Sequence, residues 1–460
     1  MFLHDTIAAI ATPPGESGIG IIRISGPEAK AIACQILRTG RGRPVAEIPD
    51  HQIRHGLVFD PGTQHPVDEV LYFYAARPRS FTAEDTVEIH CHGGGYIVKK
   101  VLEILLRRGA RLAEPGEFTQ RAFLNGRIDL VQAESIIDLI RAKSAAAHGL
   151  ALNQLTGRAS RQIDAIEGRL YQMLVAIEAV LDFPEEGIPE TGRADLLAQA
   201  NEIEGQLDEM YAAIDCNRKI RDGFSVVIAG RPNVGKSSLF NAFLQEERAI
   251  VTEIPGTTRD ILEAELQLQG VLYRIADTAG LRVTDHPVER IGISKAEQLL
   301  EEADLILFVL DGGAALTEDD RRIAARLSGR RFIAVINKLD LPRRLDLDLL
   351  ADFHPVEVIE ISVKQEIGMD RLLAVLTGLV ARGELELDDR ITLSSPRHKA
   401  ALASAGDALR SFSDGLQSGR TEDLLAIDLR SCLHAIGEIT GKNVSEEVIK
   451  GIFANFCIGK

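Results

Sequence analysis

The spacing of apolar residues changes along this chain and divides it into four stretches. Residues 1–118 combine short apolar runs, Pro/Gly-rich turns and one helical repeat, which predicts a compact α+β domain. From 119 to 222, apolar residues recur every three or four positions, which predicts helices. Residues 223–380 alternate strand-like runs with helical stretches, as an α/β domain does. Residues 381–460 return to the helical spacing.

Helical stretches on both sides of the α/β stretch indicate an insertion. We expect the two helical parts to pack as one bundle, with the α/β domain inserted between them in the sequence. The length of 460 residues fits about three such domains. Strand-like runs of the inserted domain lie at 224–229, 271–276, 305–310, 332–336 and 356–361.

Composition excludes several classes of protein. The net charge of −16 gives no global basic field, so RNA contact requires a local patch or a partner. The five cysteines, Cys34, Cys91, Cys216, Cys432 and Cys457, include no C-x-x-C pair and suit reduced thiols. The chain shows no signal peptide and no apolar run near the roughly 20 residues that span a bilayer. We expect a cytoplasmic protein.

A phosphate-binding loop follows the first strand of the α/β domain. Its sequence, Gly230-Arg-Pro-Asn-Val-Gly-Lys-Ser237, matches G-x-x-x-x-G-K-S between a strand and a helix. Gly230 and Gly235 allow backbone N–H groups to point at a phosphate. Lys236 can then reach the β- and γ-phosphates, and the Ser237 hydroxyl can hold Mg²⁺.

Further motifs at strand ends select GTP. Asp277 opens a D-x-x-G motif and can hold Mg²⁺ through water. Asn337 opens an N-K-x-D motif that ends at Asp340. The Asp340 carboxylate can accept two guanine N–H groups that adenine lacks, so the motif selects GTP over ATP. Thr258 lies in the intervening switch segment and is a second candidate Mg²⁺ ligand. The motifs predict a nucleotide site of Asn233, Val234, Gly235, Lys236, Ser237, Ser238, Gly256, Thr257, Thr258, Asp277, Thr278, Ala279, Gly280, Asn337, Lys338, Leu339, Asp340, Ser362, Val363 and Lys364.

The position after D-x-x-G departs from Ras-like enzymes. Those enzymes carry a glutamine there that orients the attacking water, whereas this chain has Leu281, which cannot. Glu289 lies eight residues further and either polarises a water or is a solvated carboxylate at a helix start. In the N-terminal domain, His90 and His92 share one face of a strand, either as a metal pair or as ordinary strand histidines.

The motifs together resemble the MnmE (TrmE) family of tRNA-modification GTPases over essentially the whole chain. The stretches that carry this resemblance are Asp5-Thr-Ile-Ala, Ala11-Thr-Pro-Pro-Gly, Arg23-Ile-Ser-Gly, Phe81-Thr-Ala-Glu-Asp, His92-Gly-Gly, Pro115-Gly-Glu-Phe-Thr-Gln-Arg-Ala-Phe-Leu-Asn-Gly126, Asp129-Leu, Gln132-Ala-Glu, Val288-Glu-Arg-Ile-Gly and Cys457-Ile-Gly-Lys460. The chain departs from the usual pattern at Ala83, where glycine is usual, and at Arg127, where other members carry lysine.

The resemblance implies a folate-binding, dimerising N-terminal domain. Its folate contacts would fall on Arg23, Glu88, Arg127 and Lys460. A K⁺ ion would bind Asn233, Thr252, Ile254 and Thr257 in a nucleotide loop that also contains Glu253 and Pro255. Glu289 matches the catalytic glutamate of the family.

The function that the resemblance implies is GTP-driven modification of tRNA. A homodimer with a flavin-dependent MnmG-type partner would form a heterotetramer or larger complex. It would build a carboxymethylaminomethyl group on C5 of the wobble uridine from a tetrahydrofolate one-carbon unit. A ribosome-assembly GTPase, or a switch with incidental GTPase activity, is the alternative, and tetrahydrofolate binding would separate them.

The tail Cys457-Ile-Gly-Lys460 is either a disordered end of the chain or a segment that the preceding helix holds in a fixed place. The apolar residues of a predicted helix over 446–456 can dock, and Gly459 gives the last residue freedom to turn away. We expect the tail to reach the folate site, with Lys460 on the ligand and Cys457 near the one-carbon unit.

Overall fold

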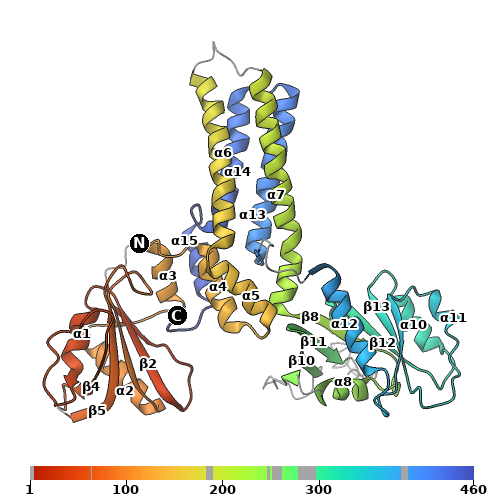
Figure 1. The fold of residues 1–460 in the computed structure, drawn as a ribbon, viewed down its shortest axis with the longest axis horizontal. Helices are drawn as coiled ribbons and strands as arrows, with labels where there is room; N and C mark the ends of the chain where they lie inside the picture. Colours follow the sequence, from red (N-terminus) through yellow and green to blue (C-terminus); the bar gives the residue numbers. More distant parts are fainter. Residues whose placement is uncertain are drawn as a thin grey trace, which may run out of the picture. The chain divides into compact units, whose positions relative to one another are not determined.

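The computed structural model describes residues 5–63, 65–182, 190–245, 249–250, 262–277, 297–384 and 392–460 (Figure 1). These residues form two compact units. The first takes its residues from 1–137, 154–207 and 400–460, and the second from 138–153 and 208–399. The domain boundaries predicted at 118, 222 and 380 stay predictions.

The N-terminal part is a seven-stranded sheet in the order β3-β4-β5-β6-β2-β1-β7. Its strands are β1 (Ile7–Ile10), β2 (Ser17–Ser25), β3 (Leu37–Thr39), β4 (Ile53–Asp60), β5 (His65–Ala75), β6 (Thr86–Gly93) and β7 (Arg111–Leu112). Helices α1 (Ala29–Ile36) and α2 (Gly95–Arg107) share one buried apolar cluster with residues of β2, β4, β5 and β6. On the opposite face, β2 and β6 pair Arg23 with Glu88. One face of the sheet therefore builds the core, and the other carries candidate site residues.

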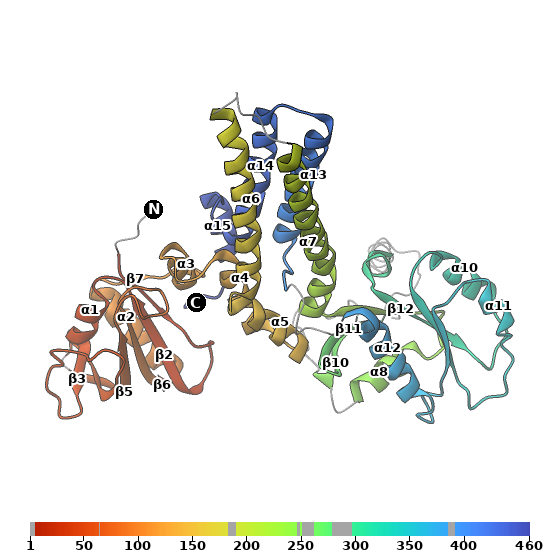
Figure 2. The ribbon, with the colours of Figure 1, turned by 45° about the horizontal axis from the view of Figure 1, so that its top comes forward.

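The helical part combines segments that lie on both sides of the α/β stretch. Its helices are α3 (Glu117–Leu124), α4 (Leu130–Arg141), α5 (Ala145–Leu155), α6 (Arg158–Asp182), α7 (Glu190–Asp222), α13 (Pro396–Ser418), α14 (Glu422–Thr440) and α15 (Glu446–Phe453). Helices α6 and α14 lie side by side (Figures 1 and 2). Lys442, two residues after α14, pairs with Asp164 of α6 at 2.9 Å. The predicted packing of the two helical parts as one bundle is thus present. The last helix is shorter than predicted, since α15 ends at Phe453.

The α/β part is a second seven-stranded sheet in the order β14-β13-β12-β8-β11-β10-β9. The elements are β8 (Phe224–Ala229), α8 (Lys236–Gln245), β9 (Ala249–Ile250), β10 (Leu262–Leu268), β11 (Val271–Asp277), β12 (Leu305–Asp311), α10 (Glu318–Arg326), β13 (Phe332–Asn337), α11 (Asp348–Ala351), β14 (Glu357–Glu360) and α12 (Met369–Glu384). The five predicted strands are present as β8, β11, β12, β13 and β14, and neighbouring pairs run parallel. Their carboxyl ends therefore share one edge of the sheet, where a ligand site belongs.

The observed architecture confirms the predicted fold class: an α+β N-terminal domain, a helical bundle and an inserted α/β phosphate-loop domain. The pattern analysis missed β3, β4, β7, β9 and β10. The two longest of these, β4 and β10, contain polar and charged residues, Arg54 and His55 in β4 and Glu265 and Gln267 in β10, which interrupt an apolar signal.

Candidate functional site

The phosphate loop joins the central strand β8 to α8. Gly230 has φ +149° and Gly235 has φ +102°, and a Cβ atom on Gly235 would lie 2.2 Å from Nδ2 of Asn337. Only glycine fits so close an approach. Lys236 is 6% exposed and donates to the carbonyl oxygens of Gly230 at 2.7 Å and Arg231 at 2.9 Å. Burial lowers the pKa of Lys236. The ammonium group thus lies inside the loop that would surround phosphates.

The structure brings two of the predicted Mg²⁺ ligands together. Asp277 ends β11 and is 1% exposed, and the Ser237 hydroxyl donates to its Oδ2 atom at 3.0 Å. A hydroxyl beside a buried carboxylate is an oxygen donor set that suits Mg²⁺. Ser237 would ligate the ion directly and Asp277 through water, where the ion would neutralise phosphate charge.

The predicted base pocket forms at the ends of β13 and β14. Asn337 donates through Nδ2 to the carbonyl oxygen of Val234 at 2.9 Å and accepts from the N–H of Val363 at 3.2 Å. Ser362 donates to Oδ1 of Asp340 at 2.7 Å, and this hydrogen bond lowers the pKa of Asp340. The carboxylate is therefore held ionised, as an acceptor of guanine N–H groups must be.

Sequence reasoning missed Asp311 at this site. Lys338 has φ +69° and donates to the carbonyl oxygen of Asn233 at 2.9 Å and to Oδ2 of Asp311 at 2.6 Å. Asn233 itself has φ +64°. The pair therefore connects the base-binding motif to the phosphate loop. Asp311 ends a strand-like run at the same sheet edge, a signal that could have identified it.

A second cluster of charges lies on the open face of the N-terminal sheet. Nε of Arg23 donates to Oε1 of Glu88 at 2.8 Å, and a ring nitrogen of His90 lies 3.4 Å from Oε2. The hydrogen bond from His90, followed by the charge of Arg23, lowers the pKa of Glu88 to about 2 against the opposing effect of burial. Glu88 is therefore an ionised acceptor at neutral pH.

Phe81 connects this cluster to Arg127. The guanidinium carbons of Arg23 and Arg127 lie 4.9 Å and 5.1 Å from the centre of the Phe81 ring. Arg127 also donates to the carbonyl oxygen of Phe81 at 2.7 Å, and burial lowers its pKa. Phe81 had no predicted role, because a single phenylalanine in a sequence carries no sign of the two cations that face it.

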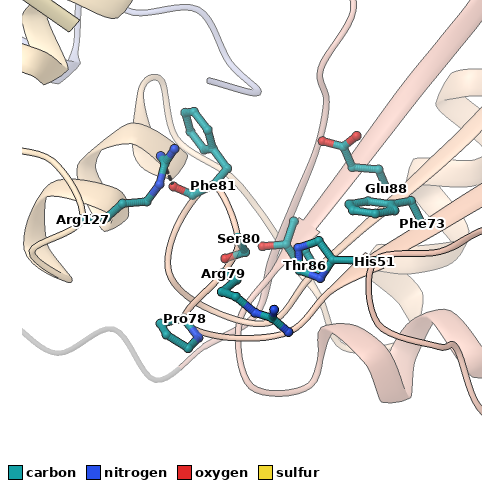
Figure 3. A pocket seen from close by; sticks show the side chains of 10 residues that line it. His51, Phe73, Pro78, Arg79, Ser80, Phe81, Thr86, Glu88 and Arg127 are labelled. Atoms are coloured by element: carbon teal, nitrogen blue, oxygen red, sulfur yellow. Dashed lines mark hydrogen bonds between the residues drawn. The ribbon is translucent and has the colours of Figure 1, made fainter. Parts of the chain in front are cut away.

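A cavity of about 470 Å³ lies beside this cluster (Figure 3). Its wall includes Phe73, Phe81, Thr86, Glu88 and Arg127. Aromatic rings, one carboxylate and two guanidinium groups, those of Arg79 and Arg127, surround a single space. This lining suits a planar ligand that has both N–H donors and a carboxylate.

The C-terminal tail docks on the N-terminal domain beside Arg23 and Glu88. The N–H of Gly116 donates to the carbonyl oxygen of Cys457 at 3.3 Å, and Arg23 donates to that of Gly459 at 3.4 Å. Burial and the charge of Arg23 lower the pKa of Lys460, while Glu88 opposes that shift. Three of the four predicted folate residues thus lie together, and Phe81 links the fourth, Arg127, to them.

Comparisons with known proteins cover the whole chain. The family of TrmE N-termini, described as GTP-binding proteins, matches residues 6–127, and the family of MnmE helical domains matches residues 130–457. The tRNA modification GTPase MnmE of Thermoanaerobacter sp. is 46% identical over 460 residues, 100% of both chains. That of Geobacter metallireducens is 46% identical over 461 residues, again with full coverage of both chains. This chain belongs to the MnmE family of tRNA modification GTPases.

Among solved structures, Era of Aquifex aeolicus bound to GDP and aluminium fluoride is 30% identical, with a TM-score of 0.29 over 40% of this chain and 66% of that chain. Membership of the MnmE family makes this protein a GTP-binding hydrolase of tRNA modification, a class that uses GTP and Mg²⁺. No helix among the described residues is long and apolar enough to cross a membrane.

Several predicted MnmE site residues lie outside the described residues. They are Thr252, Glu253, Ile254, Pro255, Gly256, Thr257, Thr258, Thr278, Ala279, Gly280 and Glu289. Their roles stay predictions.

Of the two interpretations of His90 and His92, a metal pair or ordinary strand histidines, the contacts favour the second, because each ring pairs with its own carboxylate. His92 contacts Oδ1 of Asp68 at 2.8 Å, whereas His90 contacts Glu88. No group of three or more metal-ligating side chains occurs in the part of the chain that the structure describes.

Proposed function

We propose that the chain hydrolyses GTP to drive modification of C5 of the wobble uridine, position 34, in certain tRNAs. It does so in the cytoplasm as a homodimer, with a flavin-dependent MnmG-type partner. The added carboxymethylaminomethyl group takes its first carbon from a tetrahydrofolate derivative. The observation that carries this proposal is the docked tail, because it brings Lys460 close to the Arg23–Glu88 pair, and Glu88 lines the cavity.

The folate derivative binds through complementary charges. Glu88, ionised at neutral pH, accepts N–H donors of the pterin ring, while Arg23, Arg127 and Lys460 hold carboxylate oxygens. Phe81 lies between the two arginines and offers a ring face to the flat part of the ligand. When bound, the tetrahydrofolate derivative supplies the one-carbon unit, and Cys457 lies on the tail that reaches this site.

Hydrolysis needs a positive charge that an arginine would otherwise supply to the transition state. K⁺ at Asn233, Thr252, Ile254 and Thr257 supplies the positive charge, and Glu289 orients the attacking water. The left-handed backbone of Asn233, with its carbonyl oxygen held by Lys338, supports a fixed conformation at the first of these ligands. Closure of two GTPase domains on each other completes the site.

Calorimetry with 5-formyltetrahydrofolate on the full-length protein tests the proposal. Wild type should bind, and Glu88→Gln should lose most of the affinity, because an amide replaces the ionised acceptor. Glu69→Gln is the matched control, since Glu69 lies on a neighbouring strand, pairs with His55 and does not line the cavity. No binding by wild type, or equal binding by Glu88→Gln, would reject the folate site.

A further inference from the structure

The β10–β11 hairpin joins the nucleotide site to a distant contact within the α/β unit. Its strands pair without interruption from Leu262 opposite Asp277 to Leu268 opposite Val271. Asp277, at the open end, contacts Ser237 of the phosphate loop. The predicted switch residue Thr258 precedes the hairpin by four positions in the sequence. A continuous antiparallel ladder moves as one body, so a displacement at its open end also moves its turn.

The turn of the hairpin docks on the segment that leads into α5. Its two residues, Gln269 and Gly270, have φ +47° and +80°. The N–H of Ala146 donates to the carbonyl oxygen of Gly270 at 3.0 Å. Nζ of Lys143 contacts both carboxylate oxygens of Glu265, at 2.6 Å and 2.8 Å. Two independent polar contacts therefore hold the hairpin to the start of α5.

Apolar packing completes this contact. Ala146 and Leu150 are 6% and 2% exposed and belong to the same buried cluster as Leu268 and Val271 of the hairpin. Ser144 caps α5 by accepting from the N–H of Ala147 at 3.1 Å. The start of α5 therefore packs against the hairpin, so that a movement of the hairpin would also move the start of α5.

The helix that precedes Lys143 in the chain packs against the segment that carries the tail. Helix α4 runs without a break from Leu130 to Arg141 and is separated from Lys143 by one residue. Leu130 and Ala133 share a buried cluster with Phe453 and Phe456, which lie just before Cys457. One stretch, residues 130–150, therefore contacts the GTPase hairpin at its end and the tail-bearing segment at its start.

We propose that residues 130–150, the coupling segment, transmit the nucleotide state from the β10–β11 hairpin to the tail at the folate site. Lys143 is a positioning residue in this role, because it holds Glu265 and touches neither nucleotide nor folate. The inference rests on the proposed function for what the tail does, but the movement itself can be measured without it.

Charge reversal of the Lys143–Glu265 pair tests the inference in the full-length protein. Lys143→Glu and Glu265→Lys should each leave GTP affinity near wild type and lower wobble-uridine modification in cells at least about fivefold, the lower end of typical coupling. The double reversal restores the pair and should restore modification. Lys399→Glu is the matched control. It breaks an ion pair in the same unit, between Lys399 and Asp215 at 2.6 Å, that does not involve the hairpin. Cells with this variant should modify wobble uridine normally.

Hydrogen exchange supplies a readout that does not depend on tRNA. In wild type, peptides covering 141–150 and 454–460 should differ in protection between GDP and a non-hydrolysable GTP analogue. Lys143→Glu should abolish the difference at 454–460, and the double reversal should restore it. Equal protection in both nucleotide states of wild type would overturn the inference. Normal wobble-uridine modification by the two single variants would also overturn it, as would a folded double variant that fails to restore the modification. Wild type that responds in exchange but modifies no uridine would refute the proposed function alone.

Discussion

Replacing Gly459 by alanine should release the tail from the N-terminal domain. Gly459 has φ +94°, and a Cβ atom built on it would lie 2.3 Å from the carbonyl oxygen of Ile10 and 3.0 Å from Cα of Ala11. Both neighbours are backbone atoms, one in the last residue of β1 and one in the residue after it. They cannot rotate away as a flexible side chain would, so the tail itself must move.

The expected loss of docked tail follows from comparing the strain of Gly459→Ala with the contacts that hold the tail in place. Backbone strain for an L-residue in the left-handed region costs about 1–2 kcal/mol before any overlap is counted. Against it stand two hydrogen bonds that join the tail to the N-terminal domain, from Gly116 to Cys457 at 3.3 Å and from Arg23 to Gly459 at 3.4 Å. At about 0.5 kcal/mol each for such long bonds, they contribute about 1 kcal/mol. The strain therefore offsets this part of the docking free energy and should lower the docked population about tenfold, the change that 1.4 kcal/mol gives.

Hydrogen exchange of residues 454–460 and calorimetry with 5-formyltetrahydrofolate measure this loss. Gly451→Ala is the matched control, because its added Cβ atom meets no atom within 4 Å and lies within α15, where alanine is favoured by about 0.5–1 kcal/mol. GTP hydrolysis by both variants should remain at the wild-type rate. A Gly459→Ala protein with wild-type protection and wild-type folate affinity would refute the argument.

Three further substitutions test separate parts of the structure. Asp340→Asn should weaken GTP binding by about 2–4 kcal/mol and favour xanthosine triphosphate, because the amide presents a donor to guanine; a nucleotide competition assay that finds unchanged GTP affinity counts against the base pocket. The pKa of Glu88 is lowered from its ordinary 4.5 to about 2, so the ionised carboxylate stabilises the fold fully above pH 4.5, and this stabilisation is lost as the pH falls towards 2. In urea melts, Glu88→Gln should therefore lower the free energy of unfolding more at pH 7 than at pH 3. Ala83→Gly should raise the free energy of unfolding by up to about 1 kcal/mol, because Ala83 has φ +60°; a lower value would contradict the strain.

Much of the nucleotide site could be predicted because its residues are contiguous motifs at strand ends. Parallel strands bring their carboxyl ends to one edge, so the positions of Lys236, Asp277 and Asn337 follow from the order of the elements. The contact between Ser237 and Asp277 was predictable for the same reason. The pairing of Lys338 with Asp311 was not, since it depends on a backbone turn that no motif specifies.

The N-terminal site was predictable only through the resemblance to a family. Arg23 and Glu88 lie on strands whose pairing register no local pattern determines, and Arg127 comes from a turn after α3. Phe81 contacts Arg23 and Arg127 through tertiary structure alone. His90 contacts Glu88 from two positions along the same strand, a local contact that the sequence analysis did not use. Docking of the tail was expected from its apolar helix, but its contact with Gly116 was not.

Of the four proposed K⁺ ligands, the structure describes Asn233, while Thr252, Ile254 and Thr257 lie outside the described residues. Hydrolysis should be fast in K⁺ and slow in Na⁺, and Glu289→Ala should lose turnover while it keeps nucleotide affinity. Equal rates in the two salts would count against the cation, and an active Glu289→Ala would exclude the glutamate.

Mass spectrometry of tRNA wobble uridine tests the central claim most directly. Cells that lack this protein should lose the carboxymethylaminomethyl group at position 34, and the wild-type gene should restore it. Lys236→Ala should fail because it cannot bind phosphate, and Cys457→Ser should reduce the modification while its purified form hydrolyses GTP normally. Unchanged wobble uridine in cells without the protein would contradict the proposed function.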